Sequence, residues 1–123
     1  MIASEEHLAG IAGALLKSKR GLTAPERRLL ENSIKPNPMD VLAIRAGILA
    51  GDDPLGSLFC QLRSPEKRRR EGATYTPAPI VRSMVAWAAR QDRTPVRIVD
   101  VGAGSGRFSI ACATQFPDAE IVA

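Results

Sequence analysis

Apolar residues recur at helical spacing near the start of the chain. Four of them between positions 8 and 16 fall on one face of a helix that Gly21 is expected to end: Leu8, Ile11, Leu15 and Leu16. Four later segments begin as helices do, with a capping side chain beside a proline. These starts are Thr23 with Pro25 and Glu26, Asn37-Pro38, Asp53-Pro54 and Ser64-Pro65. Residues 1–66 are therefore predicted to form a helical N-terminal region.

The pattern changes after residue 66. Thr76 is expected to cap a helix with Pro77 at its first position, and the apolar residues of that helix mark its buried face: Ile80, Val81, Met84, Val85 and Ala88. The segment 96–101 is short and β-branched, which favours a buried strand. A glycine-rich turn, a helix over 107–116 and a strand over 120–123 follow. This βαβ order predicts an α/β fold with a parallel sheet.

The turn after the first strand carries the clearest chemical pattern. Asp100, Gly102, Gly104 and Gly106 alternate with other residues. Glycine at a strand end lets the backbone turn tightly and lets a ligand come close to it. The dinucleotide pattern G-x-G-x-x-G fails because the chain has Arg107 where the third glycine belongs, and no Gly-Lys-Ser/Thr follows for a P-loop. The carboxylate favours a ligand with an ammonium group and repels a pyrophosphate.

The stretch VDVGAGSG, residues 99–106, resembles the first motif of class I methyltransferases that use S-adenosylmethionine. The resemblance implies that residues 67–123 begin a Rossmann-like, S-adenosylmethionine-binding domain. It also implies that Asp100 and the backbone of Gly102, Gly104 and Gly106 hold the methionine end of the cofactor. Ser105 and Arg107 receive no role in this interpretation.

The stretch GATYTP, residues 72–77, narrows the resemblance. Together with the apolar helix after it, this stretch is similar to the segment that precedes the glycine motif in adenine-N6 DNA methyltransferases of restriction–modification systems. The matching residues are Gly72, Ala73, Tyr75, Thr76 and Pro77. The resemblance implies that Thr76 and Pro77 contact the carboxylate end of the cofactor. A helix N-terminus capped by Thr76 also suits a carboxylate, and the ring of Tyr75 is expected to lie against the cofactor or the pocket wall.

A second motif of that family, [DNS]-P-P-[YFW], is absent from the 123 residues, so no catalytic residue is assigned. The acid that binds the cofactor ribose is expected just beyond the second strand, after the last residue of this sequence. The sequence thus predicts an incomplete methyltransferase domain over 67–123 that is catalytically inactive by itself. The complete enzyme would transfer a methyl group to adenine in DNA.

A mildly basic composition permits a polyanionic partner. The formal net charge is +4, and a run of four basic residues precedes GATYTP: Lys67, Arg68, Arg69 and Arg70. These residues are candidates for contacts to DNA phosphates, and the alternative is a solvated face whose charge Glu66 and Glu71 reduce.

The remaining polar and apolar features point away from metals and membranes. Cys60 and Cys112 lie among apolar neighbours, which favours buried free thiols, and neither has a partner at zinc-ligand spacing. The apolar run 8–16 is too short to span a membrane. We therefore expect a cytoplasmic protein without metal or membrane contact.

Two other functions remain open from the sequence. The first is a class I methyltransferase that acts on a small molecule, RNA or protein, in which GATYTP is a coincidence. The second is a non-enzymatic helical interaction module joined to a degenerate nucleotide-binding fold.

Overall fold

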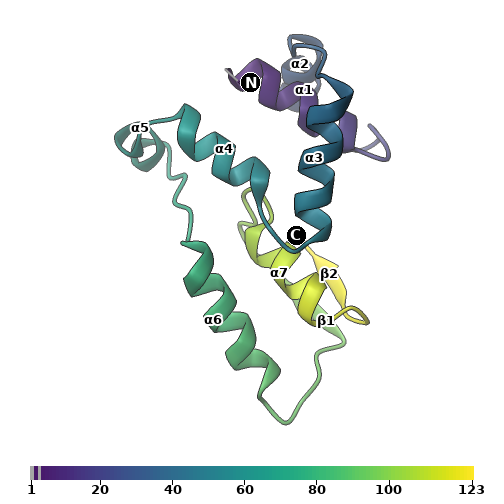
Figure 1. The fold of residues 1–123 in the computed structure, drawn as a ribbon, viewed down its shortest axis with the longest axis vertical. Helices are drawn as coiled ribbons and strands as arrows, with labels where there is room; N and C mark the ends of the chain where they lie inside the picture. The colour runs from purple at the N-terminus through teal and green to yellow at the C-terminus, as the bar shows by residue number, and fades with distance from the viewer. Residues whose placement is uncertain (1, 3) are drawn as a thin grey trace.

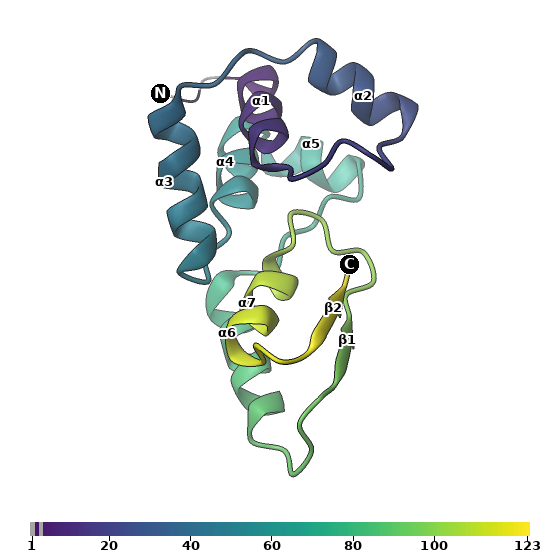
Figure 2. The same cartoon turned by 90° about the vertical axis from the view of Figure 1, so that its right-hand side faces the viewer.

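The computed structural model describes residues 2 and 4–123, and in these residues helices precede a small α/β unit (Figures 1 and 2). The helical region contains α1 (Glu5–Leu15), α2 (Ala24–Glu31), α3 (Pro38–Leu49), α4 (Pro54–Leu62) and α5 (Pro65–Arg70). The α/β unit contains α6 (Ala78–Ala89), β1 (Arg97–Val99), α7 (Arg107–Gln115) and β2 (Glu120–Val122).

The four predicted helix starts are confirmed. Thr23 forms a complete capping box with Glu26, whose carboxylate accepts the Thr23 backbone N–H at 2.6 Å. Asn37 accepts the N–H of Met39 at 2.9 Å, and the side chains of Asp53 and Ser64 cap α4 and α5 in the same way. Each cap satisfies a backbone donor that has no partner within its own helix.

The first helix is shorter than predicted. It ends at Leu15, because Leu16 is already extended with a ψ of 127°. Gly21 instead has a φ of +85° and forms the turn before α2. Glycine adopts this left-handed backbone conformation readily, so Gly21 forms part of the connection between α1 and α2 and not the end of α1.

The start of α6 also differs from the prediction. Pro77, and not Thr76, is the N-cap, and the helix begins at Ala78. The carbonyl of an N-cap residue accepts the first hydrogen bond of its helix. The Thr76 carbonyl accepts instead from Nη1 of Arg107 at 2.8 Å, and the Pro77 carbonyl accepts from Ile80 at 2.9 Å.

Only part of the predicted buried face of α6 is buried. Val81 and Val85 are buried against α7, whereas Ile80 and Met84 are about half exposed. Helix α7 makes the main contacts of α6 with another element. The apolar stripe is therefore wider than the helix that covers it.

The predicted parallel sheet is confirmed. β1 pairs with β2 in parallel, with Ile98 opposite Ile121, and the Asp100 N–H extends the ladder to Val122 at 2.8 Å. Figure 1 shows α7 between α6 and this sheet. The prediction of a buried strand is wrong, because Val99 remains 60% exposed in a described sheet of two strands.

Helix α1 organises the helical region. It contacts α2, α3 and α4, and its fully buried Ile11 lies near Leu8 and Ile44 in the apolar core. Arg63, at the end of α4, pairs with both Glu5 and Glu71. Its hydrogen bonds hold the pKa of Glu5 below the ordinary value. The described helices include none with the length and apolar character needed to cross a membrane.

Candidate functional site

A cavity of about 310 Å³ lies between the segment 72–76 and the glycine turn. The two stretches that the sequence singled out therefore face one another, although more than twenty residues separate them. Five predicted site residues line the cavity, namely Tyr75, Thr76, Asp100, Gly102 and Gly104. Pro77 and Gly106 lie outside the lining and act as the N-caps of α6 and α7.

The glycine turn has the conformation that its sequence indicates. Gly102, Gly104 and Gly106 have φ values of +80°, +59° and +85°, a region that other residues rarely adopt. A Cβ atom built at Gly102 or Gly104 meets no atom within 4 Å. The backbone here is bent for the turn and is open on its outer side, where a ligand can approach closely.

Asp100 links the end of β1 to the start of α7. Its Oδ2 accepts hydrogen bonds from the backbone N–H of Ser109 at 3.1 Å and from the Ser109 hydroxyl at 2.6 Å. Gly106 has no side chain to cap α7, so the carboxylate of Asp100 supplies the cap. Both bonds use the same oxygen, and the side chain still lines the cavity.

Tyr75 forms an aromatic wall. Its ring centroid lies 5.8 Å from that of Phe59 in α4, and the guanidinium carbon of Arg107 lies 5.5 Å from its ring centroid. Burial raises the pKa of the Tyr75 phenol, so the ring remains neutral at physiological pH. Tyr75 lines the cavity together with Thr76.

Three residues that received no site role from the sequence form a buried polar group beside the cavity. Oδ2 of Asp53 accepts from the Ser105 hydroxyl at 2.6 Å and from Nε of Arg107 at 2.9 Å. The side chain of Asp53 is only 4% exposed. The helical region thus contacts the glycine turn directly, through a charged hydrogen bond.

Two sequence signals could have indicated this group. Arg107 is the first residue of α7, where the positive end of the helix dipole disfavours a cation. Gly56 lies inside α4, where glycine costs about 1 kcal/mol relative to alanine. Each residue is unfavourable for its own helix, which indicates a contact with another part of the chain.

The charges of the cavity have a simple arrangement. Asp100 and Arg107 are the charged residues of its lining, one acidic and one basic. They approach from the two ends of the glycine turn. The cavity therefore suits a ligand that carries one cationic and one anionic group.

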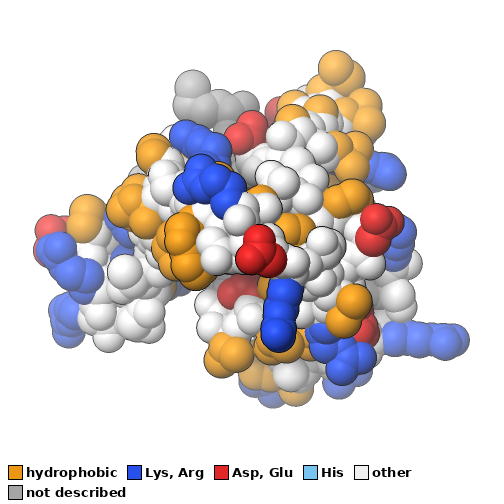
Figure 3. Space-filling view, turned by 90° about the horizontal axis from the view of Figure 1, so that it is seen from below, with side chains coloured by type: hydrophobic (Ala, Val, Ile, Leu, Met, Phe, Trp, Pro, Cys, Tyr) orange, Lys and Arg blue, Asp and Glu red, His pale blue; other side chains and the backbone are white. Residues whose placement is uncertain are grey.

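The predicted basic run forms α5. Lys67, Arg69 and Arg70 are exposed, whereas Arg68 is half-buried and donates to the Arg63 carbonyl at 3.2 Å. Arg69 also pairs with Glu66 at 3.4 Å. On the face drawn in Figure 3, Lys and Arg side chains are scattered among hydrophobic ones.

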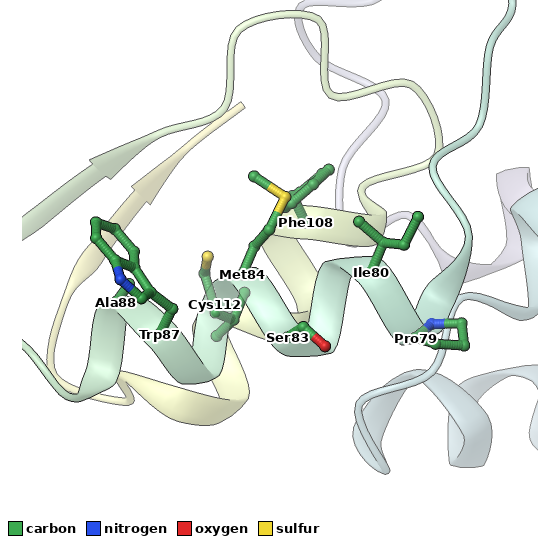
Figure 4. A pocket seen from close by; sticks show the side chains of 9 residues that line it. Pro79, Ile80, Ser83, Met84, Trp87, Ala88, Phe108 and Cys112 are labelled. Carbon is green, nitrogen blue, oxygen red and sulfur yellow. The ribbon is translucent and has the colours of Figure 1, made fainter.

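A larger groove of about 600 Å³ lies between α6 and α7 (Figure 4). Its lining is almost entirely apolar and includes Met84, Phe108 and Cys112, with Trp87 62% exposed at one end. Such a groove offers no charged partner for a zwitterionic ligand. The smaller cavity at the glycine turn is the better candidate for the cofactor site.

Cys60 and Cys112 are free thiols, as predicted, but each is only half-buried. Burial raises the pKa of Cys112. Across residues 2 and 4–123, the structure brings together no set of three His, Cys, Asp or Glu side chains that could hold a metal ion.

One comparison covers nearly the whole chain. This chain is 43% identical over 130 residues, or 98% of its length, to the Type II methyltransferase M.XamI of Xanthomonas campestris pv. amaranthicola. The chain is therefore similar over nearly all of its length to a type II methyltransferase. The resemblance seen in the sequence is thereby confirmed, and this chain spans 23% of the length of M.XamI.

A second similarity is shorter. The release factor glutamine methyltransferases of Escherichia coli K12 and Shigella flexneri are each 42% identical over 52 residues, or 42% of this chain and 19% of theirs. No family profile and no solved structure matches the chain. The similarity to M.XamI covers 98% of the chain and therefore includes the N-terminal helices.

Proposed function

We propose that the cavity at the glycine turn binds S-adenosylmethionine. The observation that carries this proposal is the pair of opposite charges on the cavity wall, Asp100 and Arg107, beside an open glycine backbone. The methionine end of the cofactor carries one ammonium and one carboxylate. Asp100 is placed for the ammonium and Arg107 for the carboxylate, while the glycines let the ligand approach the backbone.

This proposal assigns the cofactor carboxylate to Arg107, whereas the sequence suggested Thr76 as its partner. The N-terminus of α6 has few donors, because Pro77 and Pro79 have no N–H. The Thr76 carbonyl is already bonded to Arg107. In this proposal Thr76 and Pro77 shape the wall, and the guanidinium of Arg107 supplies the charge.

The sum of the local charges also suits this cofactor. Asp53, Asp100 and Arg107 give two carboxylates and one guanidinium, a net charge of minus one. S-adenosylmethionine carries a sulfonium, an ammonium and a carboxylate, which give a net charge of plus one. The faces of Tyr75 and Phe108 provide the apolar lining for its adenine.

Isothermal titration calorimetry with the 123-residue protein tests the site. We expect Asp100→Asn to weaken S-adenosylmethionine binding about tenfold, because an amide keeps an acceptor for Ser109 but loses the charge that faces the ammonium. Gly104→Val is expected to abolish binding, since its side chain occupies the open approach and its φ is unfavourable. Ser109→Ala is the matched control, with binding within about twofold of the wild type. Equal affinity in Asp100→Asn and the wild type would contradict the proposed charge pairing.

We further propose that the site serves methyl transfer to the exocyclic nitrogen N6 of adenine in DNA, in a restriction–modification system. The similarity to M.XamI over nearly the whole chain and the GATYTP pattern support this. In the complete enzyme the adenine nitrogen would take the methyl group from the sulfonium. The carbon–sulfur electron pair would stay on sulfur to leave a neutral thioether, and the proton released from nitrogen would pass to water. Residues 67–123 would form the start of a Rossmann-like cofactor domain, and residues 1–66 a helical region packed beside it.

The exposed basic residues of α5 complete this proposal. Lys67, Arg69 and Arg70 extend into solvent beside the segment that lines the cavity, and half-buried Arg68 holds α5 against the end of α4. Contacts of these side chains with DNA phosphates would be independent of base sequence and would weaken as salt concentration rises.

A chimera tests whether this chain can supply the cofactor site of a DNA methyltransferase. The region of M.XamI that aligns with this chain is replaced by residues 1–123, and the modified nucleosides of plasmid DNA are measured by mass spectrometry. We expect N6-methyladenine, and its loss when the chimera carries Asp100→Asn. Plasmid DNA left unmethylated by a folded chimera would contradict a role of this chain in DNA methylation.

The shorter similarity supports a second candidate, transfer to a protein side chain. In that case the isolated chain would still bind S-adenosylmethionine with the same dependence on Asp100. The chimera would then leave plasmid DNA unmodified. The longer match favours DNA because it includes the helices before the cavity.

A further inference from the structure

We propose that Asp53 is a positioning residue for the cofactor site, although it lies in the helical region and outside the cavity lining. It acts through Arg107 and Ser105, which it holds in place. This inference rests on the proposed S-adenosylmethionine site and adds a residue, and a region of the chain, on which that site depends.

The contacts of Asp53 reach three parts of the chain. Its Oδ1 accepts the Gly56 N–H of α4 at 2.8 Å, and its Oδ2 accepts from Ser105 in the glycine turn and from Arg107 in α7. Among the described residues, no buried side-chain nitrogen or oxygen is left without a hydrogen-bond partner. A buried carboxylate with this set of donors has one stable orientation, because turning it leaves a charge without partners.

Arg107 transmits this orientation to the opposite wall. Nε binds Asp53, while Nη1 donates to the Thr76 carbonyl at 2.8 Å and the guanidinium lies over the Tyr75 ring. One rigid planar group therefore spans the gap between the glycine turn and the segment 72–76. The separation of the two cavity walls is set by the place where Asp53 holds this group.

The close packing around Asp53 limits how far the arrangement can shift. A Cβ atom at Gly56 would lie 2.1 Å from Oδ2 of Asp53 and 2.3 Å from the Ser105 hydroxyl. Helix α4 thus approaches the glycine turn as closely as a residue without a side chain permits. The helical region therefore packs against the glycine turn, which forms one wall of the cavity.

The experiment combines cofactor binding with a double-mutant cycle in the 123-residue protein. We expect Asp53→Asn to weaken S-adenosylmethionine binding about tenfold in the wild-type background. The cap to Gly56 survives this change, because the amide keeps one acceptor oxygen. In an Arg107→Gln background the same change should alter the affinity less than about twofold, because the group that Asp53 positions is already lost.

Thr23→Ala provides the control for a purely structural effect. It removes the cap of α2, which lies outside the cavity lining, and we expect it to lower stability without changing the affinity. If Asp53→Asn leaves the affinity unchanged, or weakens it equally in both backgrounds, the positioning role is wrong.

Hydrogen exchange separates this inference from the proposed function, because it needs no ligand. We expect Asp53→Asn to increase exchange about fivefold or more at the backbone N–H groups of 72–76 and 102–106, while α1 and α2 keep wild-type rates. Absence of S-adenosylmethionine binding by the wild type would overturn the proposed function and leave this prediction standing. Unchanged exchange in both walls would overturn the positioning role.

Discussion

Gly56→Ala is expected to destabilise the protein by about 3 kcal/mol and to weaken cofactor binding at least tenfold. The added methyl group would overlap Oδ2 of Asp53 and the hydroxyl of Ser105, both within 2.3 Å of its ideal position. Asp53 must then turn away from Arg107, which leaves a buried ion pair broken. The helix propensity of alanine offsets about 1 kcal/mol of this cost. Urea denaturation and calorimetry with S-adenosylmethionine measure the two effects.

Gly47→Ala is the matched control, because it makes the same change inside the neighbouring helix α3. Its added Cβ lies 3.3 Å from Cγ of Pro54, a contact that a small movement of the ring relieves. We expect stability equal to the wild type or higher by up to about 1 kcal/mol, with unchanged cofactor affinity. Equal behaviour of the two variants would contradict the close approach of α4 to the glycine turn.

Gly10→Ala is expected to lower the free energy of unfolding by about 3 kcal/mol, with a fall in Tm of about 10 °C. The added Cβ would lie 1.9 Å from the backbone carbonyl oxygen of Ile34. That carbonyl belongs to a segment held against α1 by the hydrogen bond from the Ile34 N–H to the Glu6 carbonyl. Backbone atoms cannot rotate away as a side chain does, so the connection before α3 must detach from α1.

Gly13→Ala separates this clash from the ordinary effect of alanine in a helix. It lies one turn further along α1, and the three atoms nearest to its added Cβ all belong to the Leu30 side chain, with Cδ2 at 2.7 Å. A leucine methyl group can move by rotation of its side chain. We expect a change within about 1 kcal/mol in thermal denaturation, and an equal loss in both variants would contradict the role of the Ile34 carbonyl.

Local signals predicted the helical region well. A capping side chain beside a proline acts within one turn, so Thr23, Asn37, Asp53 and Ser64 could be recognised without knowledge of the fold. The same reasoning was wrong at Thr76. There a side chain from α7 takes the carbonyl oxygen that the helix would have used, and such a contact between distant residues has no local pattern.

The candidate site was half predictable for a similar reason. The alternating glycines and Asp100 lie in one short stretch, so the chemistry of one wall was visible in the sequence. The resemblance of residues 72–77 to a known segment indicated the other wall. Asp53 was recognised only as a helix cap, because its bonds to Ser105 and Arg107 depend on how α4 packs on the turn. Burial of the α6 stripe was overestimated, since periodicity shows an apolar face but not the element that covers it.

The hydrogen bond from Arg107 to Asp53 also has a consequence for recombination between genes of related proteins. A crossover between related genes near residue 66, where the sequence pattern changes, would take Asp53 from one parent and Arg107 from the other. Homologous parents that differ at either position would give hybrids with an unmatched buried charge. Functional hybrids then come mainly from crossovers before position 53 or after position 107. The segment 53–107, which includes α4 and the glycine turn, is inherited from one parent.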